Sequence, residues 1–148
     1  MKKYWAIRKA PLKDSCGLQE CMESAYTTYQ ERMGGARLPP MDLDYALEIQ
    51  GFPTWVATYD GKVVGGLTLM FEDQYATIAN IAVHPGFQGQ GLGGGLMMFA
   101  ETAAKENGYS ELRLATHVLL TENVALYRHL GWQETDRDAK RVYMAKKI

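Results

Sequence analysis

Five glycines, at positions 89, 91, 93, 94 and 95, lie at the start of a segment with the apolar spacing of a helix. Without a Cβ, successive backbone N–H groups can approach an anion closely. A helix N-terminus adds unpaired N–H donors and the positive end of the helix dipole. The pattern predicts a phosphate or pyrophosphate site. The alternative is a ligand-free turn, in which Gly93, Gly94 and Gly95 would each destabilise the helix by up to about 1 kcal/mol relative to alanine.

Two other phosphate-binding patterns compete for the same segment. Gly89, Gly91 and Gly94 have the spacing of the dinucleotide-binding fingerprint, which also needs an acidic residue at the end of the next strand, about 20 positions on. The nearest candidate, Glu111, stands at the start of its predicted strand. The P-loop pattern fails because no Lys-Ser or Lys-Thr pair follows Gly94. A dinucleotide-binding fragment is therefore the disfavoured alternative.

Asn123 and Tyr127 form a second group that can do chemistry. They are four residues apart in a predicted helix, so their side chains share one face. A tyrosine with a reference pKa of about 10 holds its proton at neutral pH and can donate it. The alternatives are a helix-start role for Asn123 and a packing role for Tyr127 beneath the sheet.

The elements that must position these residues follow from apolar periodicity and turn signals. We predict strands over residues 4–8, 54–59, 63–71, 75–83, 111–116, 132–134 and 141–145. We predict helices from Asp14 to Gly34, from Asp42 to Gln50, from Leu92 to Asn107 and from Thr121 to Gly131. Asp14 and Asp42 are the expected N-caps, residues 36–41 a proline-containing loop, and Asp60-Gly61 a hairpin turn.

The order of these elements, β-α-α-β-β-β-α-β-α-β-β, predicts a single α/β domain over residues 1–148. Its mixed sheet would have about seven strands, with an antiparallel N-terminal meander and a βαβ crossover after the fourth strand. About four helices would flank the sheet. A chain of 148 residues has the length of one domain.

The composition excludes several classes of protein. Hydrophobic residues make up 47% and charged residues 22% of the chain, which is typical of soluble globular proteins. A net charge of −1 lacks the basic excess of a nucleic-acid binder, and no run approaches the roughly 18 apolar residues of a membrane span. The basic N-terminus has no signal-peptide core, so we expect a cytoplasmic location. Cys16 and Cys21 lack metal-ligand spacing, and we expect reduced thiols and no metal.

Three segments resemble the GNAT family of N-acetyltransferases. They are NIAVHP at residues 80–85, QGQGLG at residues 88–93 and NVALYRHLGW at residues 123–132. The second fits the family pattern of Arg or Gln, two residues, Gly, one residue, then Gly or Ala. The third fits the family's Asn-x-x-Ala helix, which ends at Gly and an aromatic residue. The predicted element order also agrees, so the resemblance covers nearly the whole chain.

The resemblance implies acetyl-CoA as cosubstrate and gives each matched residue a role. Main-chain groups of Ile81, Ala82 and Val83 would pair with the pantetheine arm, Gln88, Gly89, Gly91, Gly93 and Gly94 would bind the pyrophosphate, and Asn123 would hydrogen-bond the arm. Tyr127 would protonate the leaving thiolate. The expected reaction is direct transfer of the acetyl group to a primary amine. The alternative is a non-catalytic acetyl-CoA-binding sensor, which would not need Tyr127.

The general base is where the chain departs from the family pattern, because residues 75–83 contain no carboxylate. His117, after the fifth predicted strand, has a suitable reference pKa near 6.5. A water relay is an equal alternative. The weaker candidates are His84, Glu31, Glu72 and Glu122.

The acceptor site is expected at the first two helices and their loop. The candidate residues are Tyr26, Tyr29, Arg32, Arg37, Leu38, Pro39, Met41 and Asp42. They fit a small amine, an amino acid or a peptide N-terminus. Asp42, Asp44 and Glu48 would attract a cationic acceptor unless they serve the helix dipole instead. Because the C-terminal strands offer a sheet edge, we also expect a homodimer.

Overall fold

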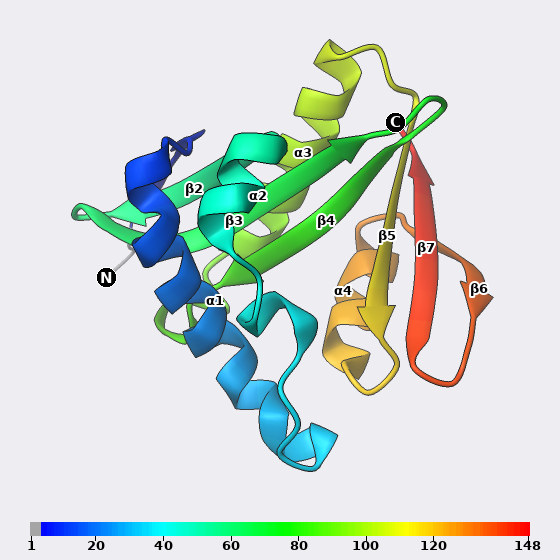
Figure 1. Cartoon of the computed structure of the whole chain (residues 1–148). Coiled ribbons are helices and arrows are strands. Elements are labelled where there is room, and N and C mark those ends of the chain that lie inside the picture. The colour runs from blue at the N-terminus through cyan, green and yellow to red at the C-terminus, as the bar shows by residue number, and fades with distance from the viewer. Residues whose placement is uncertain (1–3) are drawn as a thin grey trace.

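A seven-stranded mixed sheet with four α-helices forms the described part of the chain (Figure 1). The computed structural model describes residues 4–148; residues 1–3, part of the basic N-terminus considered above, lie outside the described residues. The strands are β1 (Ala6–Lys9), β2 (Thr54–Tyr59), β3 (Lys62–Phe71), β4 (Ala76–Val83), β5 (Glu111–His117), β6 (Gln133–Arg137) and β7 (Arg141–Lys147). The helices are α1 (Ser15–Gln30), α2 (Tyr45–Gly51), α3 (Leu92–Glu106) and α4 (Thr121–His129). Short 3₁₀ turns include η2 (Glu31–Met33), η3 (Pro39–Met41) and η4 (Pro85–Phe87).

The strand order is β1-β2-β3-β4-β5-β7-β6, and β4–β5 is the one parallel pair in the sheet. β1 to β4 are antiparallel neighbours, and α3 connects β4 to β5 as a crossover. The predicted α/β class, element order and βαβ crossover are confirmed. The glycine-rich segment follows β4 after the short turn η4, and the helix that carries Asn123 and Tyr127 follows β5.

Local sequence explains the meander and the close packing of α1 on it. Asp60 and Gly61 adopt φ values of 50° and 76°, as the tight β2–β3 hairpin requires. On β3, a Cβ added to Gly66 would lie 2.4 Å from the Leu18 side chain. Glycine at this position therefore lets α1 lie directly against the sheet.

Helices cover both faces of the sheet. In Figure 1, α1 and α2 lie in front of β2–β4 and α3 lies behind them. One core cluster joins α1 and α2 to the sheet through Leu18, Met22 and Tyr45. The larger cluster joins α3 and α4 to the opposite face through Leu92, Leu96 and other buried residues. The two clusters hold α1 and the start of α3 on opposite sides of β4.

The parallel strands β4 and β5 pair only at Ala76↔Leu112 and Thr77↔Arg113. After these pairs the strands diverge, as Figure 1 shows. The register between β3 and β4 shifts after Thr68, which leaves Ala79 without a partner as a β-bulge. The carboxyl-terminal half of β4 therefore has a free edge toward β5.

Three local predictions are corrected by the structure. Asp14 stands at the predicted N-cap position of α1, but its side chain makes no capping hydrogen bond and forms an ion pair with Arg8 at 2.5 Å. Asp44 rather than Asp42 caps α2, accepting hydrogen bonds from the backbone N–H of residues 46 and 47, because α2 starts two residues later than expected. Residues 36–41 contain the 3₁₀ turn η3, because proline is tolerated in a first turn, where its missing N–H costs nothing. No helix within residues 4–148 is long and apolar enough to cross a membrane.

Candidate active site

A cavity of about 360 Å³ lies between the end of β4, the glycine-rich turn, α1 and α4. It brings together all nine residues expected to bind the cosubstrate, as well as Tyr127. These ten lining residues are Ile81, Ala82, Val83, Gln88, Gly89, Gly91, Gly93, Gly94, Asn123 and Tyr127. We call this space the first cavity.

The glycine-rich turn presents an uncapped helix N-terminus to the first cavity. Gly89 and Gly91 have φ values of +75° and +88°, which side-chain-bearing residues rarely adopt. Gly91 occupies the N-cap position of α3 and has no side chain that could cap the helix. The first α-helical hydrogen bond runs from Gly95 N–H to the Gly91 carbonyl at 2.9 Å. The N–H groups of the first helical residues are therefore available to an anion.

Along the free edge of β4, the main-chain N–H and C=O groups of alternate residues point toward the first cavity. The Tyr26 hydroxyl donates to the Ile81 carbonyl at 3.1 Å, and the Gln88 side chain donates to the Val83 carbonyl at 3.3 Å. His84 N–H, in contrast, donates to Val64 of β3 at 2.8 Å. Since the N–H and C=O of one strand residue point to the same side and alternate along the strand, Ile81 and Val83 face the first cavity. Ala82 faces β3, so its main chain is directed away from the cavity that it lines.

Tyr127 is 7% exposed and packs 6.3 Å from the Trp132 ring, centroid to centroid. Burial, and secondarily the nearby Tyr29, raise the pKa of Tyr127 to about 12. Its hydroxyl makes no hydrogen bond to any other residue within 4–148. The side chain is thus both a packed core aromatic and a protonated group at the cavity wall.

Asn123 lies at the third helical position of α4, and Leu120 occupies the N-cap position. The helix-start alternative for Asn123 therefore does not hold. The asparagine lines the first cavity one turn from Tyr127, as the four-residue spacing predicts.

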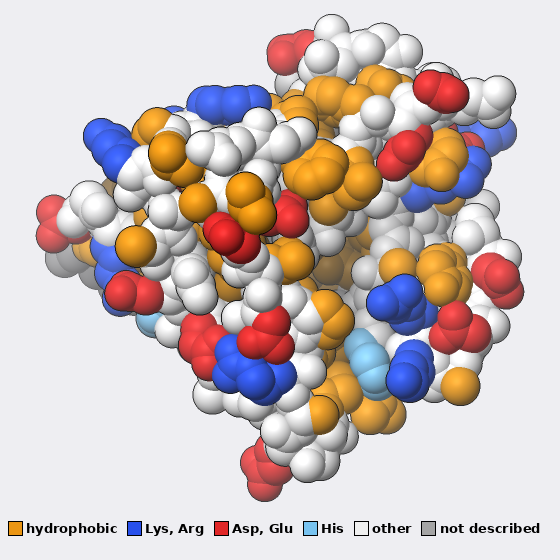
Figure 2. Space-filling model, viewed as in Figure 1, with side chains coloured by type: hydrophobic (Ala, Val, Ile, Leu, Met, Phe, Trp, Pro, Cys, Tyr) orange, Lys and Arg blue, Asp and Glu red, His pale blue; other side chains and the backbone are white. Residues whose placement is uncertain are grey.

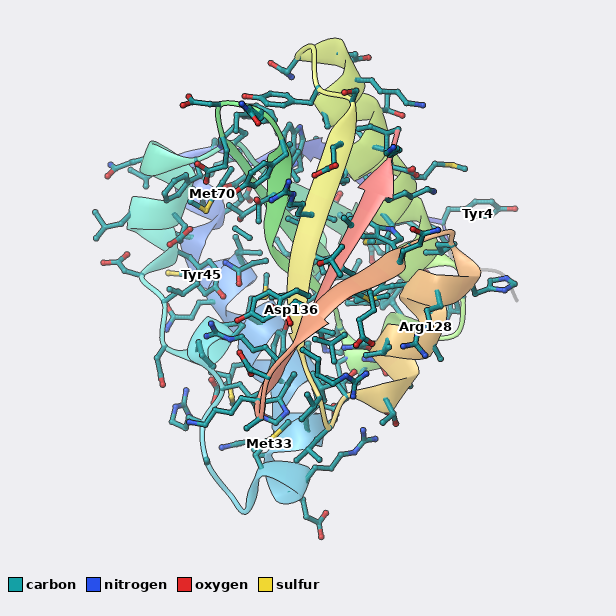
Figure 3. The ribbon with its side chains drawn as sticks, turned by 90° about the vertical axis from the view of Figure 1, so that its right-hand side faces the viewer. Tyr4, Met33, Tyr45, Met70, Arg128 and Asp136 are labelled. Carbon is teal, nitrogen blue, oxygen red and sulfur yellow. The ribbon has the colours of Figure 1, made fainter. Side chains whose placement is uncertain are left out.

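A second cavity, of about 750 Å³, lies where β4 and β5 diverge. Its walls come from β4, the end of β5, the η2–η3 segment and the start of β7. Figure 3 shows the molecule from the β6–β7 side and labels Met33, which lines this cavity from η2. Tyr26 lines both cavities, so the two spaces meet at its side chain.

The structure divides the expected acceptor residues between several places. Tyr26, Arg32, Arg37, Leu38 and Pro39 line the second cavity. Tyr29 lines the first cavity, Met41 is buried, and Asp42 pairs with Arg37 at 2.7 Å. Asp44 caps α2 and Glu48 lines neither cavity.

The candidates for the general base lie apart from one another. His117 lines the second cavity, and its Nδ1 accepts a hydrogen bond from Leu119 N–H at 3.1 Å. In the neutral imidazole this leaves the proton on Nε2 and no unoccupied acceptor nitrogen. Glu122 makes two hydrogen bonds to Arg32, at 2.7 and 2.6 Å, which lower the pKa of its carboxyl.

The remaining candidates line neither cavity: they are Glu31 in η2, Glu72 at the β3–β4 turn and His84, whose Nδ1 accepts from Gly86 N–H. No group of three or more His, Cys, Asp or Glu side chains within residues 4–148 is placed to hold a metal ion.

Comparison with known families shows to which family the chain belongs. Residues 18–132 match the family described as the acetyltransferase (GNAT) family. The chain belongs to the GNAT family. This GNAT domain is 33% identical over 103 residues to the uncharacterized N-acetyltransferase YjgM of Escherichia coli (strain K12). That match covers 66% of the present chain and spans only 62% of the length of its relative.

Solved GNAT structures share the fold over nearly the whole length. The PaiA N-acetyltransferase of Thermoplasma acidophilum, in complex with coenzyme A, has a TM-score of 0.85 at 20% identity, covering 98% of this chain and 99% of that one. The ribosomal-protein-S18-alanine N-acetyltransferase of Escherichia coli has a TM-score of 0.76 at 20% identity, covering 98% and 94%. At these identities the likeness establishes the fold.

Several wall residues are not among those predicted from the sequence. Ala25, Met97 and Leu126 line the first cavity, and Lys140 and Arg141 line the second. Leu126 carries a detectable signal, since it is an apolar residue three positions after Asn123 on the same helix face. Lys140 and Arg141 carry no such sequence signal, because the pairing of β7 with β5 brings them to the second cavity.

Proposed function

We propose that this GNAT domain transfers the acetyl group of acetyl-CoA directly to a primary amine, with Tyr127 as general acid. The observation that carries the proposal is that ten residues chosen from the sequence line one cavity, which meets a second, larger cavity at Tyr26. One space accommodates the acetyl donor and the other the amine. Family membership supports the acetyl chemistry.

The donor side fits coenzyme A through main-chain groups. The N–H groups at the start of α3 and the left-handed Gly89 and Gly91 suit a pyrophosphate. Ile81 and Val83 direct main-chain groups at the first cavity, where an extended pantetheine arm would pair with β4 as an added strand. In this proposal Ala82 contributes wall surface, and Asn123 donates a side-chain hydrogen bond to the arm.

When bound, acetyl-CoA supplies an activated thioester. The amine nitrogen forms a bond to the acetyl carbon, the carbon–sulfur bond breaks, and the sulfur leaves as a thiolate. Ile81 N–H faces this point and would stabilise the oxyanion of the tetrahedral intermediate. The Tyr127 hydroxyl, kept protonated by its raised pKa, would give its proton to the sulfur, and the phenolate left behind would regain a proton from water.

An ammonium must lose one proton before attack, since the reference pKa of a lysine-like amine is near 10.4, and its nitrogen loses a second proton as the amide forms. We propose that water in the second cavity takes both protons. Support comes from His117, whose Nδ1 is occupied by Leu119 N–H, and from Glu122, whose carboxyl is held by Arg32. Neither side chain offers a ready acceptor to the amine.

The alternative function is a non-catalytic acetyl-CoA sensor, which needs the first cavity but not Tyr127. Release of free thiol from acetyl-CoA across a panel of amines, read with a thiol reagent, separates the two functions. We expect amine-dependent thiol release with at least one acceptor. Calorimetric binding of acetyl-CoA without thiol release for any amine would favour the sensor.

A further inference from the structure

The second cavity has cationic side chains on two of its walls and no carboxylate among its lining residues. Arg32 and Arg37 line it from the η2–η3 side, and Lys140 and Arg141 line it from the β7 side. Figure 2 shows Lys and Arg side chains beside a histidine on the right-hand rim of the central hollow. Since residues 4–148 contribute no Asp or Glu to this lining, the electrostatic field inside the cavity favours an anion.

Two of these four cations are already neutralised. Arg32 makes a bidentate pair with Glu122, at 2.7 and 2.6 Å. Arg37 pairs with Glu23 at 2.8 Å and with Asp42 at 2.7 Å. Lys140 and Arg141, in contrast, form no ion pair with any residue in 4–148. Arg141 is near enough to Asp138 to help lower the pKa of that carboxyl, but only its backbone N–H bonds to it. The side-chain donors of Lys140 and Arg141 remain available to a ligand.

The backbone fixes Arg141 toward the cavity. Arg141 is paired directly with His117 across β5 and β7, and the next pair is Thr116↔Val142. Val142 is fully buried in the core on the α3 side. Because successive strand residues point to opposite faces and directly paired residues share a face, Arg141 and His117 project together from the other face, where the second cavity lies.

The Asp138 carboxylate stabilises the turn before β7 through hydrogen bonds to its backbone. Asp138 accepts hydrogen bonds from the backbone N–H of Lys140 at 2.8 Å and of Arg141 at 2.7 Å, and from the Tyr143 hydroxyl at 3.0 Å. The Lys140 carbonyl accepts from Val118 N–H at 2.9 Å. This network fixes the backbone from which both cationic side chains project. Binding a ligand here therefore loses less conformational entropy than binding it on a mobile loop would.

We propose that the acceptor is an amine that also carries an anionic group, a carboxylate or a phosphate, and that Arg141 and Lys140 bind this group. The amine end then lies toward Tyr26 and Ile81, where the two cavities meet. This inference rests on the proposed acetyl transfer and names the class of its substrate. A polycationic amine would meet two cations that form no ion pair with any residue in 4–148, and Asp42, Asp44 and Glu48 do not line the cavity to offset them.

The test compares acceptors that share an amine and differ in one negative charge. The pairs are L-amino acids with their carboxamides, and phosphoethanolamine with ethanolamine; 1,4-diaminobutane is the cationic probe. Loss of the carboxylate lowers the pKa of the neighbouring amine, so the carboxamide has more neutral amine at pH 8 and chemistry alone favours it. A preference for the amino acid therefore reports on the protein.

We expect kcat/KM for the anionic member of at least one pair to exceed that of its neutral partner about tenfold or more, as a charge-assisted hydrogen bond provides. The responding pair identifies the anion. Arg141→Gln should remove most of this preference through the acceptor KM, with the acetyl-CoA KM unchanged. Arg141→Glu should raise kcat/KM for 1,4-diaminobutane. The matched control is Lys105→Gln on α3, which removes one exposed charge away from both cavities.

Equal or better turnover of the neutral members, unaffected by Arg141→Gln, would overturn this inference and leave the proposed acetyl transfer intact. Absence of thiol release with every amine, while acetyl-CoA binds, would overturn the proposed function and this inference with it.

Discussion

The Tyr26 hydroxyl donates a hydrogen bond to the Ile81 carbonyl oxygen at 3.1 Å, and this bond joins α1 to the free edge of β4. It lies where the two cavities meet, since Tyr26 lines both. Burial raises the pKa of Tyr26 well above its ordinary value, so the hydroxyl keeps its proton and remains a donor. The Ile81 carbonyl is thus occupied by the protein. In the proposed acetyl transfer, Ile81 N–H is the group of this residue that would meet the developing oxyanion.

Tyr26→Phe should show what that bond contributes. Removal of the hydroxyl leaves the Ile81 carbonyl without its donor, and we expect a loss of about 1 kcal/mol in the free energy of unfolding. Turnover should fall more than acetyl-CoA affinity does, because the strand edge loses its fixed position at the reacting end of the site. Urea unfolding and steady-state kinetics measure the two effects. Unchanged turnover with normal stability would show that the bond does not position Ile81.

The glycine-rich turn predicts opposite stability effects for two neighbouring substitutions. Gly91→Ala forces a side chain into a φ of +88° and should destabilise the fold by roughly 1–2 kcal/mol. Gly94→Ala adds a Cβ that meets no protein atom within 4 Å, and as a helical substitution it should stabilise the free protein by up to about 1 kcal/mol.

Both variants should nevertheless bind coenzyme A more weakly, because Gly91 and Gly94 both line the first cavity. Thermal unfolding without ligand, followed by calorimetric titration with coenzyme A, separates stability from binding. If Gly94→Ala binds coenzyme A as tightly as the wild type, the first cavity is not the pyrophosphate site.

Because the Cys21 thiol is buried, we expect the free energy of unfolding to fall at alkaline pH. Burial raises its pKa from 9.0 to about 12, and burial likewise raises the pKa of Tyr127 from 10.0 to about 12. The folded state holds both protons more tightly, so the unfolded chain ionises first. The stabilisation is complete below pH 9 and is lost as the pH rises toward 12, by at most about 1.4 kcal/mol per pH unit for each group.

Urea unfolding at intervals from pH 8 to pH 11 measures this loss. Cys21→Ala, although less stable at pH 8, should not begin to lose stability until about pH 10, while Cys16→Ala, at an exposed position, should keep the wild-type profile. A wild-type free energy of unfolding that stays flat over this range would contradict the prediction.

The proposed water relay predicts that neither side-chain candidate controls the pH profile. His117→Ala and Glu122→Gln should each retain the wild-type dependence of kcat/KM on pH, because one side chain accepts from Leu119 N–H and the other pairs with Arg32. Glu122→Gln should cost less than about 1 kcal/mol in stability, as expected for an exposed ion pair. Loss of the acidic limb of the profile in His117→Ala would assign the base to His117.

Elements with strong local signals were predictable from the sequence. Asp60-Gly61 placed the β2–β3 hairpin, and the glycine-rich segment placed the start of α3. Asp14 occupies the predicted N-cap position, but its side chain pairs with Arg8 and does not cap the helix. Asp42 was wrong as a cap, because α2 begins after Asp44 and the Asp42 side chain pairs with Arg37. Cap chemistry is local, whereas these ion pairs depend on where neighbouring segments are placed.

The donor half of the site follows from motifs, and the acceptor half does not. Asn123 and Tyr127 share a helix face by spacing alone, so their common cavity was predictable. The bulge at Ala79, the Tyr26–Ile81 bond and the cations at Lys140 and Arg141 all depend on strand register and on contacts between distant segments. No pattern within one segment specifies such relationships.

Thiol release from acetyl-CoA at saturating acceptor, measured for the wild type and for Tyr127→Phe, tests the proposed reaction most directly. A general acid contributes about a hundredfold or more to the rate, so kcat should fall by that factor in the variant. The calorimetric Kd for coenzyme A should stay within about twofold, because the phenyl ring preserves the packing against Trp132. Full turnover in Tyr127→Phe would contradict the role of Tyr127, and absence of amine-dependent thiol release in the wild type would contradict acetyl transfer itself.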